Sequence, residues 1–141
     1  MNKIDFWYII NSAKEVNPHN INKQRADIEK ALSKHSIKSI RKFNYIAESL
    51  IIEAKDEGLK EFLCVIFKDQ ISNNRFDFFM GWLILQGDAL YNQTIKDPKF
   101  LKEIIEINFN NDFTVLSFEE GLHIASSAYE IKTGRNYFED F

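Results

Sequence analysis

The feature that most constrains the fold is a nearly unbroken apolar and aromatic run over residues 76–87, which holds one carboxylate, Asp77, near its start. A helix that is apolar on all sides has no face to present to water, so other helices must pack around it. The run is also too short to cross a bilayer. The sequence therefore predicts a buried central helix around Trp82 and no membrane-spanning segment.

Helical patterns also fill most of the remaining chain. Apolar residues recur at helical spacing, and residues typical of turns and helix ends separate the segments. The expected helices cover residues 4–16, 21–34, 37–56, 59–68, 75–86, 88–96, 99–106 and 118–133. With 141 residues, the chain has the length of one domain. We expect an all-α, single-domain, multi-helix globule over residues 1–141, built around the central apolar helix.

Local patterns predict where three of these helices begin. Ser36 is suited to cap the helix over residues 37–56, and Asn74 is suited to cap the central helix. Asp77 would then occupy the third helical position, where a carboxylate interacts favourably with the positive end of the helix. Ser117 and Glu120 have the spacing of a capping box, which predicts the start of the last long helix.

Two further expectations concern the segment before and within that last helix. Residues 108–112 have the composition of a loop, and the pattern leaves room for a short strand at residues 113–115. Gly121, Ala125 and Ala128 put small residues on adjoining helical turns. This stripe would let another helix approach closely, or it is one face of a crowded core.

Charge is unevenly distributed along the chain. The net charge is −3, yet residues 22–42 hold seven basic and two acidic side chains, whereas residues 43–141 hold nine basic and 17 acidic ones. This pattern indicates either solvated helix faces or a surface of one sign that binds a partner. Nucleic-acid binding is not expected, because the chain is acidic as a whole and aromatic residues are sparse around the basic segment.

Asp77 is the titratable group inside the central apolar run, so it is the first candidate for a ligand site. Apolar neighbours would raise its pKa, as an acid or a base requires. The alternative is a structural role, in which Asp77 caps its own helix or pairs with Arg75. Gln86, near the end of the same run, and His123 complete the set of ligand-binding candidates.

Metal and cofactor motifs are sparse in this sequence. Glu120 and His123 have the Glu-x-x-His spacing that puts two metal ligands on one helix face, but bundles with two metal ions need this motif twice and it occurs once. The chain has no glycine-rich phosphate loop, no His-Glu-x-x-His and no Cys-x-x-Cys. We therefore expect no metal, no cofactor and no catalytic residue set.

Three motifs together resemble a bacterial family of unknown function numbered 4240. They are the central Phe-Asp-Phe-Phe-Met-Gly-Trp-Leu-Ile-Leu-Gln-Gly run, an opening Phe6-Trp7, and a closing Ala-Tyr-Glu-Ile-Lys-Thr-Gly at residues 128–134. The chain departs from the family pattern at Met80, where the family has arginine, and in the loop at residues 69–75, which lacks the family's glycine-rich sequence. The resemblance implies a small, mainly helical bacterial protein with no known activity.

Two functional hypotheses follow from the sequence. The acidic bulk and the lack of a catalytic constellation favour a non-enzymatic protein-binding module, of which toxin-neutralising immunity proteins are one class. Its partner would be a basic protein, bound through the acidic residues Glu103, Glu106, Glu139 and Asp140. The alternative is a small-molecule-binding protein or an enzyme with a site around Asp77 and Gln86. Residues 1–20 lack a signal-peptide pattern, which predicts a cytoplasmic location.

Overall fold

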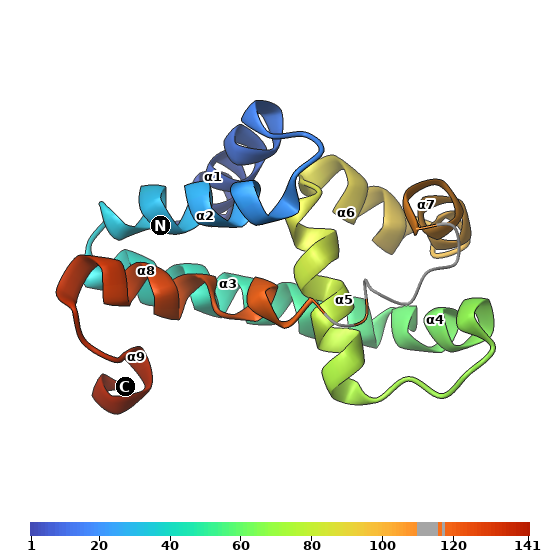
Figure 1. Cartoon of the computed structure of the whole chain (residues 1–141). Coiled ribbons are helices and arrows are strands. Elements are labelled where there is room, and N and C mark those ends of the chain that lie inside the picture. Colours follow the sequence, from blue (N-terminus) through green and yellow to red (C-terminus); the bar gives the residue numbers. More distant parts are fainter. Residues whose placement is uncertain (110–115, 117) are drawn as a thin grey trace.

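Helix α5 (Asn73–Leu85) lies at the centre of the fold, as the apolar run predicted. The structure is a computed structural model that describes residues 1–109, 116 and 118–141. In it, α5 crosses the neighbouring helices (Figure 1). Helices α1, α2, α3 and α6 all contact α5. Its buried residues are Phe76, Phe79, Met80, Gly81, Trp82, Leu83, Ile84 and Leu85.

Helices account for all the regular secondary structure of the described residues, and the predicted all-α fold is confirmed. The other α-helices are α1 (Lys3–Val16), α2 (Ile21–Ser33), α3 (Ile37–Asp56), α4 (Leu59–Phe67), α6 (Asp88–Lys96), α7 (Phe100–Phe109), α8 (Ile124–Thr133) and α9 (Tyr137–Asp140). A 3₁₀ turn, η2 (Glu119–Leu122), precedes α8. None of the described helices has both the length and the apolar composition that a bilayer-spanning segment requires.

The helices lie on two sides of α5 (Figure 1). On one side α8 packs on both α2 and α3, and α1 packs on α2 and on α5. On the other side lie α4, α6 and α7, with α7 in contact with the other two. Buried side chains from both sides form a single hydrophobic cluster that includes Phe6 of α1, Leu50 of α3 and Leu101 of α7.

The predicted cap of α3 is confirmed, and that of α5 is wrong. The Ser36 hydroxyl accepts a hydrogen bond from the backbone N–H of Ser39 at 3.1 Å. In α5, the corresponding bond runs from the N–H of Arg75 to the hydroxyl of Ser72 at 3.2 Å, so Ser72 and not Asn74 is the cap. Buried Ile71 lies directly before Ser72, where a hydrophobic residue helps to fix the start of a helix.

The last long helix also begins later than predicted. Residues 119–122 form the 3₁₀ turn η2, and α8 starts at Ile124. The cause is a close approach between η2 and α5: a Cβ atom on Gly81 would lie only 3.2 Å from the Cα atom of Gly121. The predicted capping residue Ser117 lies outside the described residues, as does the proposed strand at 113–115.

Two smaller differences concern helix ends. Helix α7 continues to Phe109, so the predicted loop starts at least two residues later than Asn108. The C-terminal residues form the short helix α9, capped by Asn136, whose side chain accepts hydrogen bonds from the N–H groups of Phe138 and Glu139. The chain reverses before α9 at Gly134, which has a φ of 70° and ends α8 as predicted.

Candidate functional site

Asp77 lies in the second turn of α5, where it does not cap the helix. Because α5 begins after Ser72, the carboxylate is too far along the helix to bond its first N–H groups. Asp77 takes part in none of the ion pairs among the described residues, so it is not joined to Arg75 either. Neither structural role suggested by the sequence is therefore seen, and the half-buried side chain faces a cavity.

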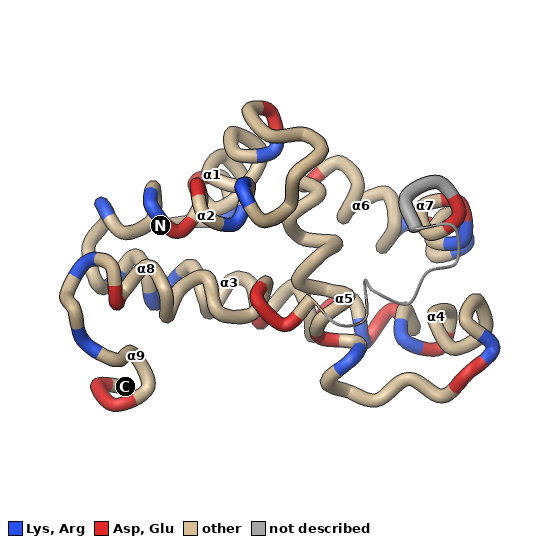
Figure 2. Tube along the Cα trace, in the orientation of Figure 1, with Lys and Arg blue, Asp and Glu red and all other residues tan. Residues whose placement is uncertain are grey.

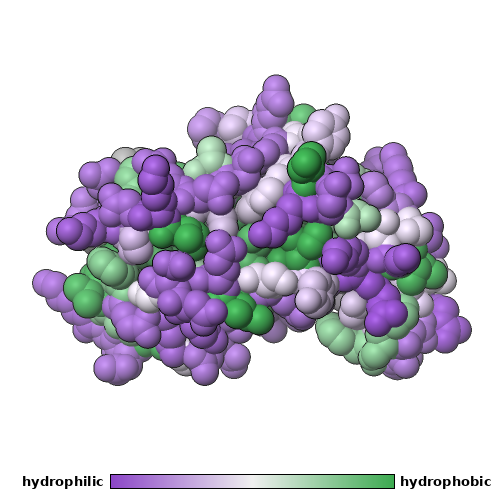
Figure 3. All heavy atoms as spheres, turned by 180° about the vertical axis from the view of Figure 1, so that it is seen from behind, coloured by the Kyte–Doolittle hydropathy of each residue, from purple (hydrophilic) through white to green (hydrophobic). Residues whose placement is uncertain are grey.

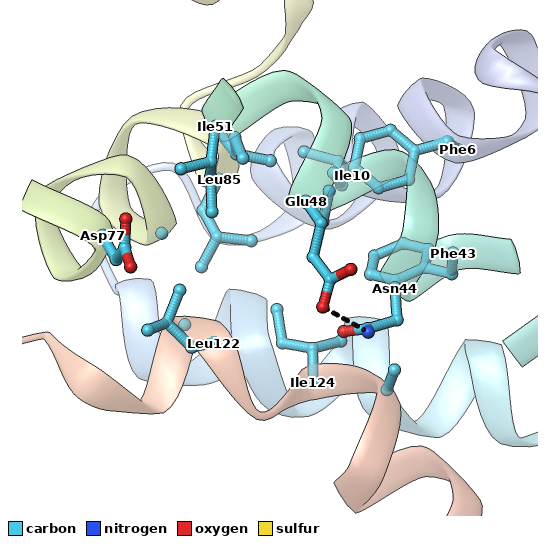
Figure 4. Close-up of a pocket in the computed structure, with 15 residues that line it drawn as sticks. Phe6, Ile10, Phe43, Asn44, Glu48, Ile51, Asp77, Leu85, Leu122 and Ile124 are labelled. Atoms are coloured by element: carbon cyan, nitrogen blue, oxygen red, sulfur yellow. Dashed lines mark hydrogen bonds between the residues drawn. The ribbon is translucent and has the colours of Figure 1, made fainter. Parts of the chain in front are cut away.

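This cavity, which we call the α3–α5 pocket, has a volume of about 190 Å³. Residues from α1, α3, α5, η2 and α8 line it, so it forms where segments far apart in the sequence meet (Figure 4). Its lining is mainly apolar. The lining residues are Phe6, Ile10, Phe43, Asn44, Ala47, Glu48, Ile51, Asp77, Gly81, Ile84, Leu85, Gly121, Leu122, Ile124 and Ala125.

Three polar side chains, Asn44, Glu48 and Asp77, interrupt this apolar lining. Asp77 lies on one side of the pocket, and Glu48 and Asn44 lie on the other, with apolar side chains such as Leu85 between them (Figure 4). Asn44 donates a hydrogen bond from Nδ2 to the Glu48 carboxylate at 3.1 Å. Glu48 is exposed, and Asn44 and Asp77 are both half-buried and reach solvent in part, so these polar groups mark the mouth of the pocket, from which the apolar part extends inward.

The position of Asp77 affects its ionisation. Partial burial removes water from the carboxylate and raises its pKa above the ordinary value of 3.8. The positive charges of Lys55 and Lys60 act in the opposite direction, but burial has the larger effect. Both lysines have contacts elsewhere: Lys60 Nζ donates to Asn73 at 2.7 Å, and Lys55 Nζ lies 5.8 Å from the centre of the Phe76 ring.

Two glycines form one wall of the pocket. Gly81 of α5 and Gly121 of η2 meet backbone to backbone, which brings η2 against α5. A Cβ atom on Gly121 would lie 2.8 Å from Cε2 of Phe118 and 3.0 Å from the Cα atom of Gly81, distances too short for an undisturbed structure. The next residue, Leu122, lines the pocket, so this contact fixes the position of part of the wall.

Gln86 lies away from the α3–α5 pocket. Its side-chain oxygen accepts a hydrogen bond from Lys14 Nζ at 2.8 Å, and its side-chain nitrogen donates to the carbonyl of Trp82 at 3.2 Å. Lys14 also donates to the carbonyl of Pro18 at 3.0 Å. Gln86 therefore joins the end of α5 to α1, and the structure does not bring it together with Asp77.

His123 is also outside the pocket lining, although Leu122 and Ile124 on either side belong to it. Its Nε2 lies 3.5 Å from a carboxylate oxygen of Glu119. Glu120, its partner in the Glu-x-x-His motif, is exposed and belongs to η2, whereas His123 lies between η2 and α8. The two residues are therefore not on one helix. The described residues contain no group of three or more His, Cys, Asp or Glu side chains arranged to hold a metal ion.

The four acidic partner-binding candidates fall at two distant places. Glu103 and Glu106 are exposed on α7, whereas Glu139 and Asp140 belong to α9 at the opposite end of the molecule (Figure 2). Asp140 is committed to internal contacts, because it forms an ion pair with Arg135 at 2.7 Å and accepts a hydrogen bond from the Tyr129 hydroxyl. These residues therefore form two separate acidic sites.

Asn44 and Glu48 were missed by the sequence analysis. Both lie on α3, one turn apart, and α3 turns this edge toward α5 and η2. They lie beside the apolar stripe that the buried residues of α3 form, which are Ile40, Phe43, Ile46, Leu50 and Ala54. The signal in the sequence was weak: Ala47 and Ile51 extend the apolar stripe around the helix next to this polar pair. Only the packing of α3 against segments far along the chain shows that the pair faces Asp77.

A comparison with models of known protein families finds a match. Residues 1–131 match the model of a family described as "Protein of unknown function (DUF4240)". All residues that line the α3–α5 pocket fall within the matched range, whereas α9 lies outside it. No curated protein and no solved structure matches the chain.

Proposed function

The chain belongs to the DUF4240 family, and since that family's description names no activity, we propose a function from the pocket itself: the protein binds a small, largely apolar molecule in the α3–α5 pocket, without transforming it. The observation that carries this proposal is the combination of an apolar cavity with a few polar groups at its mouth. This combination is typical of sites for small organic ligands, in which the apolar lining supplies affinity and the polar groups fix orientation.

The size of the cavity limits the ligand. An apolar cavity of roughly 150 Å³ in another protein accommodates benzene. The α3–α5 pocket, at about 190 Å³, suits a molecule with one ring or a branched chain of similar volume. Larger ligands would have to extend through the mouth past Glu48 or displace Leu122.

The lining supports binding over catalysis. The part of the lining that the structure describes contains no histidine, cysteine, serine, threonine or lysine, which are the residues most often used as nucleophiles or as bases near neutral pH. Among the described residues that line the pocket, Asp77 and Glu48 are the only titratable groups. We therefore propose a binding protein, with an enzyme that uses these two carboxylates as the alternative.

An NMR screen of small apolar compounds would test the proposal. Methyl resonances of Ile10, Ile51 and Leu122 report directly on the pocket, whereas those of the exposed Val65 on α4 serve as an internal control. We expect compounds with one ring to shift the pocket resonances in a saturable manner, with the Val65 signal unchanged.

A pair of matched variants completes this experiment. Ala47→Leu places three additional carbon atoms inside the pocket and should abolish the shifts, whereas Ala89→Leu makes the same change at an exposed position of α6 and should preserve them. If no compound shifts the pocket resonances at millimolar concentration, or if Ala47→Leu binds as well as the parent protein, the proposed function is wrong.

We also propose a second function, the binding of a basic protein, because apolar side chains are exposed along one face of α1. Ile4, Tyr8 and Val16 are 78%, 74% and 73% exposed. Ile4 and Tyr8 are four residues apart and so share one side of the helix, and Tyr8 and Val16 line the same hollow. Asp5 and Asp27 line the hollow beside them. Apolar patches are also visible on the back of the molecule (Figure 3).

An immunity protein that neutralises a toxin in the bacterial cytoplasm would be one form of this second function. Isolation of complexes from the native host would test it, followed by measurement of binding for Tyr8→Ala and for the exposed control Tyr45→Ala on α3. We expect only Tyr8→Ala to weaken the complex. A toxin gene directly upstream of the coding sequence would support the immunity role, and a partner lost equally in both variants would contradict the use of α1.

A further inference from the structure

The mouth of the α3–α5 pocket carries two carboxylates whose charge is not balanced by an ion pair. In the described part of the chain, neither Glu48 nor Asp77 forms an ion pair with a lysine, arginine or histidine. A carboxylate that is partly removed from water loses hydration energy, and an opposite charge close by restores part of it. Asp77 is in this position, since it is half-buried beside an apolar cavity.

The nearest lysines do not supply this charge. Lys60 is directed to Asn73, to which it donates a hydrogen bond at 2.7 Å, and Lys55 lies over the ring of Phe76. Both influence Asp77 only through longer-range electrostatics. A positive charge bound in the mouth itself would therefore find two carboxylates available.

The hydrogen-bonding groups at the mouth point to the same chemistry. Carboxylates only accept hydrogen bonds, and one of the two amide N–H groups of Asn44 already donates to Glu48, so the mouth offers mainly acceptors. An alkylammonium group has three donors and no acceptor, and therefore matches this set. A ligand carboxylate or phosphate would meet two negative charges and would be repelled.

These observations extend the proposed small-molecule function, on which the inference rests. We propose that the ligand of the α3–α5 pocket is a protonated amine, with an apolar body inside the cavity and its ammonium group in the mouth between Asp77 and Glu48. The apolar walls, which include the rings of Phe6 and Phe43, determine the shape of the body that fits. The two carboxylates select the charge of its head.

Three probes that share one body and differ in the head group test this proposal. They are 2-phenylethylamine, which is protonated at pH 7, the neutral 2-phenylethanol, and the anionic 3-phenylpropionate. Titrations followed through the methyl resonances of Ile51 and Leu122 give an affinity for each. We expect the amine to bind about tenfold or more tightly than the alcohol, and the anion to bind weakest.

Substitutions at the mouth separate the effect of charge from that of shape. Asp77→Asn and Glu48→Gln keep the size of each side chain and remove its charge, so each should weaken binding of the amine while leaving the alcohol unchanged. Glu103→Gln removes one negative charge from the distant helix α7 and serves as the control, with amine binding as in the parent protein. Spectra of each variant without ligand verify that it is folded.

The outcomes distinguish this inference from the function on which it rests. Equal binding of amine and alcohol, or tighter binding of the anion, would overturn the amine proposal and leave small-molecule binding intact. Equal weakening of amine binding by Glu103→Gln would also overturn it, because only the overall charge would then matter. If none of the three probes binds, and the wider screen of apolar compounds also finds nothing, both proposals fail.

Discussion

At the scale of single residues, Asp77 shows how position within a helix changes the role of a carboxylate. One turn earlier in α5, it would have interacted with the free N–H groups at the helix start, which stabilise negative charge. In the second turn it faces an apolar cavity, and the loss of water raises its pKa. The sequence suggested Asp77 as a cap, but in the fold its charged form is partly removed from water, which costs free energy of folding.

This cost leads to a prediction for Asp77→Asn. Since the pKa of Asp77 is higher in the folded than in the unfolded chain, the folded state binds the proton more tightly, and stability falls as the pH rises between the two pKa values. Removing the carboxylate should then raise the midpoint of chemical denaturation at pH 7. The gain should shrink as the pH is lowered toward about 3.9, the ordinary pKa of an aspartate, below which Asp77 is mostly protonated in both states.

Denaturation curves at pH 7 and at about pH 4 would test this expectation. A variant that is less stable than the parent at pH 7 would contradict it. That result would mean that the attraction of Lys55 and Lys60 exceeds the effect of burial. The same experiment on Glu48→Gln provides a comparison with an exposed carboxylate at the same mouth, for which a much smaller change is expected.

At the scale of helices, α5 is the central element, which α1, α2, α3 and α6 all contact. Trp82 is 7% exposed, and its ring centre lies 5.8 Å from that of Phe79. Trp82→Ala should reduce the free energy of unfolding by about 3–5 kcal/mol, because it removes a large buried ring and leaves a cavity. Chemical denaturation would measure this loss. Trp7→Ala on α1 is the matched control, and its half-buried ring should contribute less. Equal midpoints for Trp82→Ala and the parent protein would contradict the central role of α5.

The contact between α5 and η2 gives another prediction. Gly121→Ala should destabilise the fold by about 1–3 kcal/mol, because the added methyl group would overlap the ring of Phe118 and the backbone of Gly81. Gly81→Ala should cost less, since its methyl group would meet Gly121 at the longer distances of 3.2 and 3.3 Å and alanine favours the helix. Thermal denaturation of both variants would establish the order. A Gly121→Ala variant as stable as the parent would show that η2 moves freely away from α5.

Helix boundaries also show what local sequence could and could not predict. The predicted bounds of α3 agree with the observed ones, Ile37–Asp56, because Ser36 and Gly58 both act within a few residues of the helix ends. The predicted start of α8 was wrong because the contact between Gly81 and Gly121 is set by tertiary packing.

In the candidate site, Asp77 was found from the sequence because a carboxylate is conspicuous in an apolar run. Its neighbours in the pocket, Asn44 and Glu48, come from a helix about 30 residues earlier, and no local pattern connects them.

At the scale of the whole molecule, charge is arranged so that acidic groups occur at more than one site. Glu48 and Asp77 lie at the pocket, Glu103 and Glu106 lie on α7, and α9 lies at the far end (Figure 2). A protein partner of ordinary size covers only about 800 Å² on each side. It would therefore contact one acidic site directly and sense the others through their long-range field.

This arrangement sharpens the prediction for a basic protein partner. If that partner binds near α7 instead of on α1, replacing Glu103 or Glu106 by lysine, one at a time, should slow association more than it speeds dissociation, because exposed charges act mainly on encounter. Reversal of Glu139 on α9 is the matched control and should have a smaller effect, since α9 lies at the opposite end of the molecule. Asp140 is unsuitable as a control because its ion pair with Arg135 would also be lost.

Salt provides an independent test of the same idea. The association rate should fall steeply as ionic strength rises past about 0.15 M, where the screening length is about 8 Å, while the dissociation rate changes little. Kinetics at two salt concentrations, measured for the parent protein and the variants of α7 and α9, would separate these effects. A rate of association that does not depend on salt, or a partner that is itself acidic, would contradict electrostatic steering. Equal slowing by the α7 and α9 variants would instead mean that the partner responds to the net charge of the molecule, because no single acidic site would then determine where it binds.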